Sequence, residues 1–174
     1  MNNKQDKLSP GALSLIALAV DYCSTIEHSE GADRDQYIAR INRLLTRLYI
    51  CAYDLSRETD SFVEEVLDPA LDERQYDECR EALSVIMADQ DIYLETVVED
   101  MRFSDTPVAQ SISENLADIY QEMYNFVHSV EPADTQTQLM LVDVLIDDFR
   151  NFWGQTLCNV VRALHSAEFY HNIY

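Results

Sequence analysis

The chain has 174 residues, of which 47% are hydrophobic and 25% are charged, and a chain of this size buries a full core as one domain (1–174) without disulfide or metal staples. Its 12 Lys and Arg against 32 Asp and Glu give a formal net charge of −20, a field that repels phosphate backbones and anionic lipids. We therefore expect no binding to nucleic acid or membrane, and the charge favours a basic protein as partner.

The N-terminal half predicts two long helices. Ser9 caps the first helix, Pro10 occupies its first position, and it ends near residues 29–31. Asp33 opens the second helix, with Gln36 three residues on. We expect the core face of the first helix to carry Leu13, Ile16, Val20 and Cys23. The second is the most basic stretch, with Arg40, Arg43 and Arg47 outside its apolar stripe.

The middle of the chain contains one clear helix between two connections. Residues 56–71 form the first connection, with a short helix over 62–67. A third helix starts at Asp72, again with a Gln three residues later. Residues 89–110 are expected to be irregular with short helical pieces, because a lone strand has no predicted partner.

The C-terminal half predicts the longest helices. The sequence Ser111-Ile112-Ser113-Glu114 is a capping box that opens the fourth helix. The fifth runs from Thr135 to about Leu164, roughly 45 Å at 1.5 Å per residue, and residues 166–174 add a last short helix. These amphipathic segments predict an all-α fold, an antiparallel bundle of five or six helices.

Complete catalytic motifs are absent from the sequence. On the fourth predicted helix, Glu114, Asp118 and Glu122 are spaced four residues apart. They form either a solvated or Arg-paired face of the helix or a site for a divalent cation. Glu78 and Glu81 match one half of the paired carboxylate motif of helical nucleotide pyrophosphatases, but no second half follows. We therefore predict no metal site and no cofactor.

Gly154 lies in the interior of the fifth predicted helix, where glycine costs about 1 kcal/mol relative to alanine. A missing side chain lets another helix or a ligand approach closely, so the position predicts either close helix packing or a ligand-facing groove. The candidate polar cluster or groove contains seven residues: Asp118, Asp147, Arg150, Trp153, Gly154, Arg162 and His165.

Three short motifs, in order along the chain, carry a family resemblance. They are Asp21-Tyr22-Cys23, the stretch from Ser111 to Gln121, and Phe152-Trp153-Gly154-Gln155 followed by Arg162-Ala163-Leu164-His165. Together they resemble an uncharacterised family of small helical proteins from Bacteroides-type bacteria, a domain of unknown function. The resemblance implies no activity. It does imply that Asp118, Trp153, Gly154, Arg162 and His165 share one pattern, in which a Trp anchor and a buried polar cluster tie the fourth helix to the fifth.

The sequence favours a cytoplasmic binding or interaction module without catalysis, because the capped helices account for a full core and no catalytic set is complete. The alternative is a metal-dependent hydrolase that uses the helix-borne carboxylates. A third class consistent with the charge is an acidic decoy that occupies a basic, nucleic-acid-binding partner.

Overall fold

The computed structural model describes residues 7–59, 67, 69–95 and 108–170. Within these ranges the chain is mostly helical, which confirms the predicted all-α class. The helices are α1 (Pro10–Glu27), α2 (Arg34–Asp54), α3 (Glu73–Met87), α4 (Ile112–Val130), α5 (Thr135–Asp148) and α6 (Gly154–Phe169). A π-helical turn, Phe149–Trp153, joins α5 to α6, and we call these three elements together the C-terminal rod. A 3-10 turn, Ala88–Gln90, follows α3.

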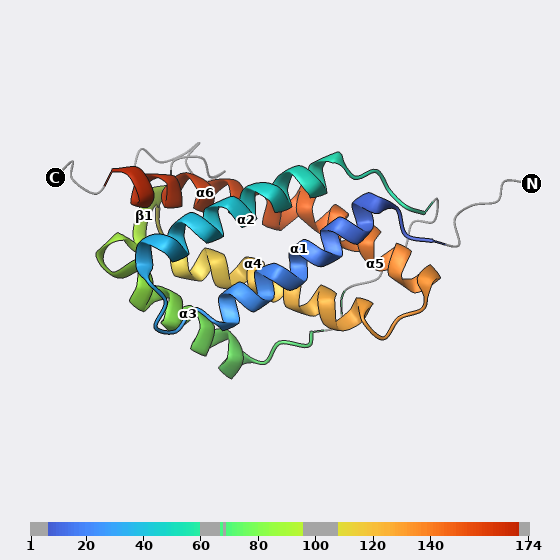
Figure 1. Ribbon diagram of the computed structural model, residues 1–174, viewed down its shortest axis with the longest axis horizontal. Helices are drawn as coiled ribbons and strands as arrows, with labels where there is room; N and C mark the ends of the chain where they lie inside the picture. The colour runs from blue at the N-terminus through green and yellow to red at the C-terminus, as the bar shows by residue number, and fades with distance from the viewer. Residues whose placement is uncertain (1–6, 60–66, 68, 96–107, 171–174) are drawn as a thin grey trace, which may run out of the picture.

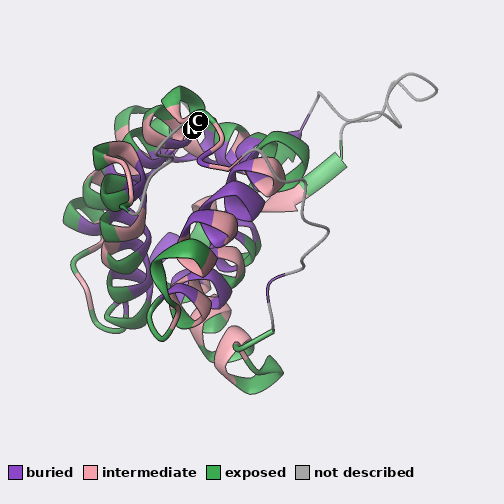
Figure 2. Cartoon of the chain, turned by 90° about the vertical axis from the view of Figure 1, so that its right-hand side faces the viewer, coloured by how far each residue is buried: buried purple, intermediate pink, exposed green. Residues whose placement is uncertain are grey.

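Four helices form the centre of the bundle. Helix α1 packs against α2 and α4, and α6 packs against the same two helices from the other side. Neighbours in this ring run antiparallel, while α3 lies along α4 at one edge (Figure 1). Viewed end-on, the buried residues face the interior of the ring (Figure 2). The α1–α2 pair is antiparallel because only residues 28–33 connect the two helices.

The helix starts agree with the sequence signals. Ser9 accepts a hydrogen bond from the amide of Ala12, and the Asp33 side chain accepts one from the amide of Gln36. At α3 the capping box is reciprocal, with Asp72 and Gln75 each bonding to the other's backbone. These side chains satisfy amides that the first turn of a helix leaves without partners.

The core face predicted for α1 is correct in part, because Cys23 is buried and Ile16 packs partly buried against the core. Leu13 and Val20 are exposed, and α1 instead buries a face that contains Leu15, Ala19 and Tyr22. Helix α1 is apolar on most sides, so two stripes one residue apart fit its sequence, and only the contacts with α2 and α4 select between them.

The irregular structure expected over residues 89–110 is also wrong where the chain is described. Strands β1 (Ile92–Glu95) and β2 (Val108–Ser111) pair antiparallel, with Ile92 opposite Ser111. The partner that β1 lacked in the prediction comes from the same segment of chain. Buried Asp91 fixes the base of the pair, because its carboxylate accepts bonds from the Ser113 amide at 2.8 Å and the Ser111 hydroxyl at 3.0 Å.

Two further expectations concern the ends of segments. The helix predicted over 62–67 falls almost entirely outside the described residues, as do 96–107 and 171–174. The separate helix predicted from residue 166 is wrong, since α6 continues without a break through Phe169.

Candidate functional site

The candidate residues taken from the sequence do not form one polar cluster. Asp118 is exposed and accepts a hydrogen bond from the Tyr76 hydroxyl of α3 at 2.6 Å. The Trp153 indole donates to the Leu145 carbonyl of its own rod at 3.1 Å. His165 packs its ring against Phe169. The Asp118 carboxylate therefore bonds to α3 and not to the C-terminal rod, although Asp118 and Trp153 line one small cavity between α4 and the rod.

Gly154 is the position where a side chain has no room. A Cβ built there would lie 2.3 Å from the Phe149 carbonyl oxygen and 2.8 Å from the Phe149 ring. Its φ of −64° and ψ of −39° are ordinary helical values, so space rather than conformation requires glycine. The close neighbour is Phe149, in the π turn directly before Gly154, and not a residue of a different helix as predicted. Such turns occur frequently at functional sites.

A groove of about 660 Å³ runs between α2 and α6. Three of the candidates, Arg150, Gly154 and Arg162, line it from the C-terminal rod, and Tyr49 and Tyr53 line it from α2. The guanidinium of Arg162 makes one long bond, 3.5 Å, to a backbone carbonyl of β1. We call this the α2–α6 groove.

Aromatic side chains form one wall of the α2–α6 groove. The Tyr49 ring stacks on Tyr53 with centroids 6.0 Å apart and meets the Phe149 ring edge-on at 5.2 Å. The adjacent Cys158 thiol, and then burial, raise the pKa of the Tyr49 hydroxyl. The wall presents hydroxyls and ring faces next to arginines, a combination that suits protein contacts.

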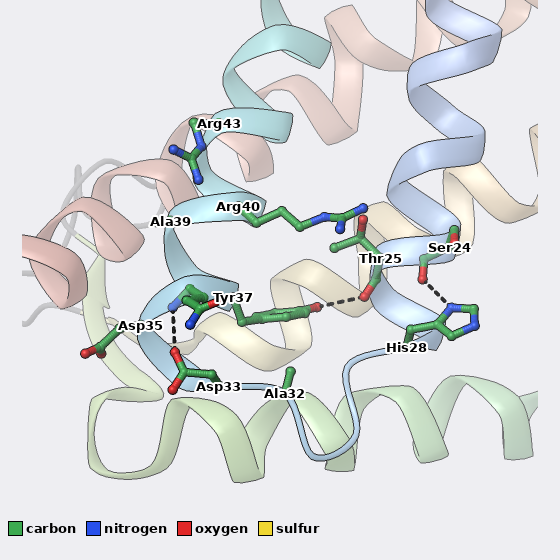
Figure 3. Close-up of a pocket in the computed structure, with 11 residues that line it drawn as sticks. Ser24, Thr25, His28, Ala32, Asp33, Asp35, Tyr37, Ala39, Arg40 and Arg43 are labelled. Carbon is green, nitrogen blue, oxygen red and sulfur yellow. Dashed lines mark hydrogen bonds between the residues drawn. The ribbon is translucent and has the colours of Figure 1, made fainter.

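A second groove, of about 810 Å³, lies between the C-terminal part of α1 and the N-terminal part of α2 (Figure 3). The Arg40 side chain extends across it to Asp21, at 3.1 Å. Below, the Tyr37 hydroxyl donates to the Thr25 carbonyl at 3.4 Å (Figure 3). Both polar and apolar side chains line this α1–α2 groove, and burial raises the pKa of Tyr37.

Helix α2 separates the two grooves and is the basic element of an acidic chain. It contains four arginines against two aspartates, Asp35 and Asp54. At 100° per residue, Arg43 and Arg47 lie on the solvent-facing side of the helix, away from its buried stripe. Within the described part of the chain, neither of them forms an ion pair.

The remaining arginine of α2 is structural. Arg34 donates through Nε to the Ile86 carbonyl at 3.0 Å and through Nη2 to the Met87 carbonyl at 3.3 Å. It thereby satisfies carbonyl groups at the C-terminal end of α3. We therefore assign Arg40, Arg43 and Arg47, and not Arg34, to the exposed basic surface.

The carboxylates of α4 do not gather into a metal site. Asp118 and Glu122 line a small cavity of about 180 Å³ together with Trp153. Burial, and then the nearby carboxylates of Asp148 and Asp118, raise the pKa of Glu122. Among the described residues, no three His, Cys, Asp or Glu side chains converge as metal ligands.

Two acids of the C-terminal rod have structural partners. Asp143 is 2% exposed and accepts bonds from the amides of Glu58 at 2.6 Å and Thr59 at 2.9 Å. Asp147, one of the sequence candidates, pairs with Arg57 at 2.9 Å and Arg150 at 3.1 Å. Together, Asp143 and Asp147 hold the segment that follows α2 against the rod. Neither aspartate lines the α2–α6 groove, whereas Arg150 and Arg162 do.

Sequence reasoning missed the two tyrosines of the α2–α6 groove. Tyr49 and Tyr53 are four residues apart and lie beside, not within, the apolar stripe of α2. Aromatic residues in that position are a signal of a contact surface, although the helix they face cannot be identified from periodicity alone.

No helix in the described ranges combines the length and the apolar character needed to cross a bilayer. All four cysteines are free thiols, and Cys158, at the α2–α6 groove, is the exposed one.

One family model matches most of the chain. Residues 6–170 match the model of a domain of unknown function (DUF5063). A crystal structure of the protein BF1032 from Bacteroides fragilis is similar, with 25% sequence identity, a TM-score of 0.82, and coverage of 98% of this chain and 99% of that one. No curated protein matches the sequence. The resemblance to a Bacteroides-type family, inferred from three motifs, is confirmed.

Proposed function

The chain belongs to the DUF5063 family, a domain of unknown function, and we propose that it is a cytoplasmic, non-catalytic binding module that docks an acidic protein segment on α2. The docking face consists of Arg40, Arg43 and Arg47 with the α1–α2 and α2–α6 grooves on either side. One observation carries the proposal: two grooves, of about 810 and 660 Å³, flank the most basic helix of the described chain.

The charge distribution favours an acidic occupant. The chain has 12 Lys and Arg in all, and five of these lie on the exposed side of α2 or on the adjoining rod: Arg40, Arg43, Arg47, Arg150 and Arg162. A single basic face on an acidic molecule orients an incoming partner, because the rest of the surface repels the same carboxylates. Ion pairs across such a face fix register and raise the association rate.

The composition of the face also fits protein recognition. Arg and Tyr are enriched among the residues that contribute most to binding at protein interfaces. Ile50 and Tyr53 are largely exposed on α2 next to Arg43 and Arg47. An amphipathic acidic segment could place carboxylates on Arg43 and Arg47 and an apolar residue in the α2–α6 groove.

The basic partner expected from the net charge stays a separate proposal for the acidic remainder of the surface. The cytoplasmic assignment is supported by four free thiols, since secreted domains commonly pair theirs. The hydrolase alternative needs three or more converging ligands, and the described residues offer no such group, so we do not advance it.

The test uses two short fluorescein-labelled peptides, one of Glu and Leu and one of Lys and Leu, with binding followed by fluorescence anisotropy at low salt. Net charge alone favours the Lys peptide, whereas the proposed face favours the Glu peptide. The double variant Arg43→Ser/Arg47→Ser should bind the Glu peptide about tenfold more weakly, because it loses two exposed ion pairs of up to about 1 kcal/mol each.

The matched control is Arg74→Ser/Arg80→Ser, which changes the net charge equally. Both control arginines lie on α3 and pair with acids of their own helix, Arg74 with Glu78 at 2.8 Å and Arg80 with Asp77 at 3.5 Å. Equal loss in both double variants would show a net-charge effect and contradict the docking face. A wild-type preference for the Lys peptide would contradict it as well.

A further inference from the structure

A cavity of about 280 Å³ lies where the β1–β2 pair meets the start of α4 and the beginning of α6, and it shares Gln155 and Asn159 with the α2–α6 groove. Most of its lining is made of side-chain carboxamides: Gln110, Asn115, Asn151, Gln155 and Asn159. We propose that this amide cavity binds a neutral polyhydroxylated ligand, a saccharide of one or two rings. The inference does not rest on the proposed docking face.

Hydrogen bonds within the protein orient three of these carboxamides and leave some of their donors and acceptors for a ligand. Asn115 donates through Nδ2 to the Tyr93 hydroxyl, and Asn159 donates through Nδ2 to the Glu95 carboxylate. Asn151 donates through Nδ2 to the Asp147 carbonyl at 2.8 Å. Each carboxamide has two N–H donors and an oxygen with two lone pairs. Among the described residues, each of these three asparagine side chains makes one bond and keeps a donor and the acceptor for a ligand. Hydroxyl groups, which both donate and accept, match that mixture.

The charge of the cavity excludes other ligand classes. Among the described residues that line it, Glu95 is the one ionisable side chain, and it is 7% exposed. Among the described residues that line the cavity there is no Lys, Arg or His, so a phosphate or sulfate group would lack a counter-charge inside an acidic protein. An apolar ligand would leave the amides without partners. A neutral ligand with several hydroxyls avoids both costs.

Phe152 supplies an apolar surface at the rim. It belongs to the π turn, is 69% exposed, and lines the cavity together with Thr156. Its neighbour Trp153 is buried, so the turn places one aromatic residue in the core and presents the next one to solvent. The C–H face of a sugar ring packs on such an exposed ring while its hydroxyls reach the amides. A volume near the lower end of the range for small-molecule pockets suits one or two rings.

The experiment is saturation-transfer difference NMR on the full chain with a defined panel: the methyl glycosides of glucose, galactose, mannose and N-acetylglucosamine, then maltose, cellobiose and lactose. At least one neutral sugar should bind, and glucose 6-phosphate should bind more weakly than glucose. Phe152→Ala should weaken that binding about tenfold, from loss of the ring contact. Gln110→Ala should weaken it as well.

Phe169→Ala is the matched control, because Phe169 is an exposed aromatic of α6, 62% exposed, that does not line the cavity. It should leave sugar binding unchanged, and circular dichroism of both Phe variants should match the wild type because neither ring is in the core. The proposal is overturned if no member of the panel binds, if glucose 6-phosphate binds more tightly than glucose, or if the two Phe variants lose binding equally.

Discussion

Replacing Gly154 by alanine should destabilise the protein, although alanine is the better helix former. The substitution gains about 1 kcal/mol of helix propensity, and the backbone there already has helical φ and ψ. The new Cβ would lie 2.3 Å from the Phe149 carbonyl oxygen, far inside the roughly 3.5 Å of van der Waals contact. That oxygen belongs to the backbone of the π turn, so no side-chain rotation relieves the overlap.

We expect a net loss of about 1–3 kcal/mol in the free energy of unfolding, the usual range for overpacking. For a chain of this length each kcal/mol corresponds to about 2–4 °C in melting temperature. Urea unfolding followed by circular dichroism measures the loss. Ser166→Ala, at an exposed position of α6, should change stability by less than about 0.5 kcal/mol.

Gly11→Ala provides a second comparison. Its Cβ would approach the Leu55 Cδ2 atom to 2.8 Å, but that atom is the end of a flexible side chain and can move, so the loss should be smaller. A Gly154→Ala protein more stable than wild type would refute the close contact, and with it the π turn as the reason for glycine.

Three other substitutions test separate parts of the structure. Asp143→Ala should cost about 2–4 kcal/mol, because it leaves buried amides without an acceptor, and it should speed proteolysis of the connection after α2, whereas exposed Asp89→Ala should do neither. Ala88→Gly should stabilise by about 1 kcal/mol, since Ala88 has a φ of 52°; equal or lower stability would contradict that conformation. Glu122 has a raised pKa in the fold, so its ionisation opposes folding, and stability falls as pH rises through the window between its unfolded and folded pKa. Glu122→Gln should therefore stabilise at neutral pH, with a gain that shrinks toward pH 4 in denaturant titrations; a gain independent of pH would refute this.

The sequence was sufficient for features that depend on nearby residues. The Asp72 and Gln75 signal located the start of α3, and the apolar spacing from Ile112 to Val130 identified the buried face of α4. Both depend on contacts within one or two turns of helix, where residue type and spacing determine the outcome. The β1–β2 pair was missed because its partner strand is separated by residues 96–107, and strand composition alone does not show pairing.

The candidate site was predicted only in part for the same reason. Helical periodicity placed Arg150 on the same flank as Gly154, and the family resemblance added Arg162; all three line the α2–α6 groove. Tyr49 and Tyr53 complete that groove from a helix about a hundred residues earlier in the chain, and no local pattern connects the two. Gly154 was a true signal of close contact, but a sequence does not show whether the neighbour is another helix or the same helix wound as a π turn.

The most direct test of the docking face is an amide NMR titration of the ¹⁵N-labelled protein with the unlabelled peptide of Glu and Leu. We predict that the largest shift changes fall on α2 from Arg40 to Tyr53 and on the facing residues of α6 from Gly154 to Arg162, and that Arg43→Ser/Arg47→Ser removes them. Shift changes confined to α3 and α4, or unaltered by that double substitution, would contradict the account.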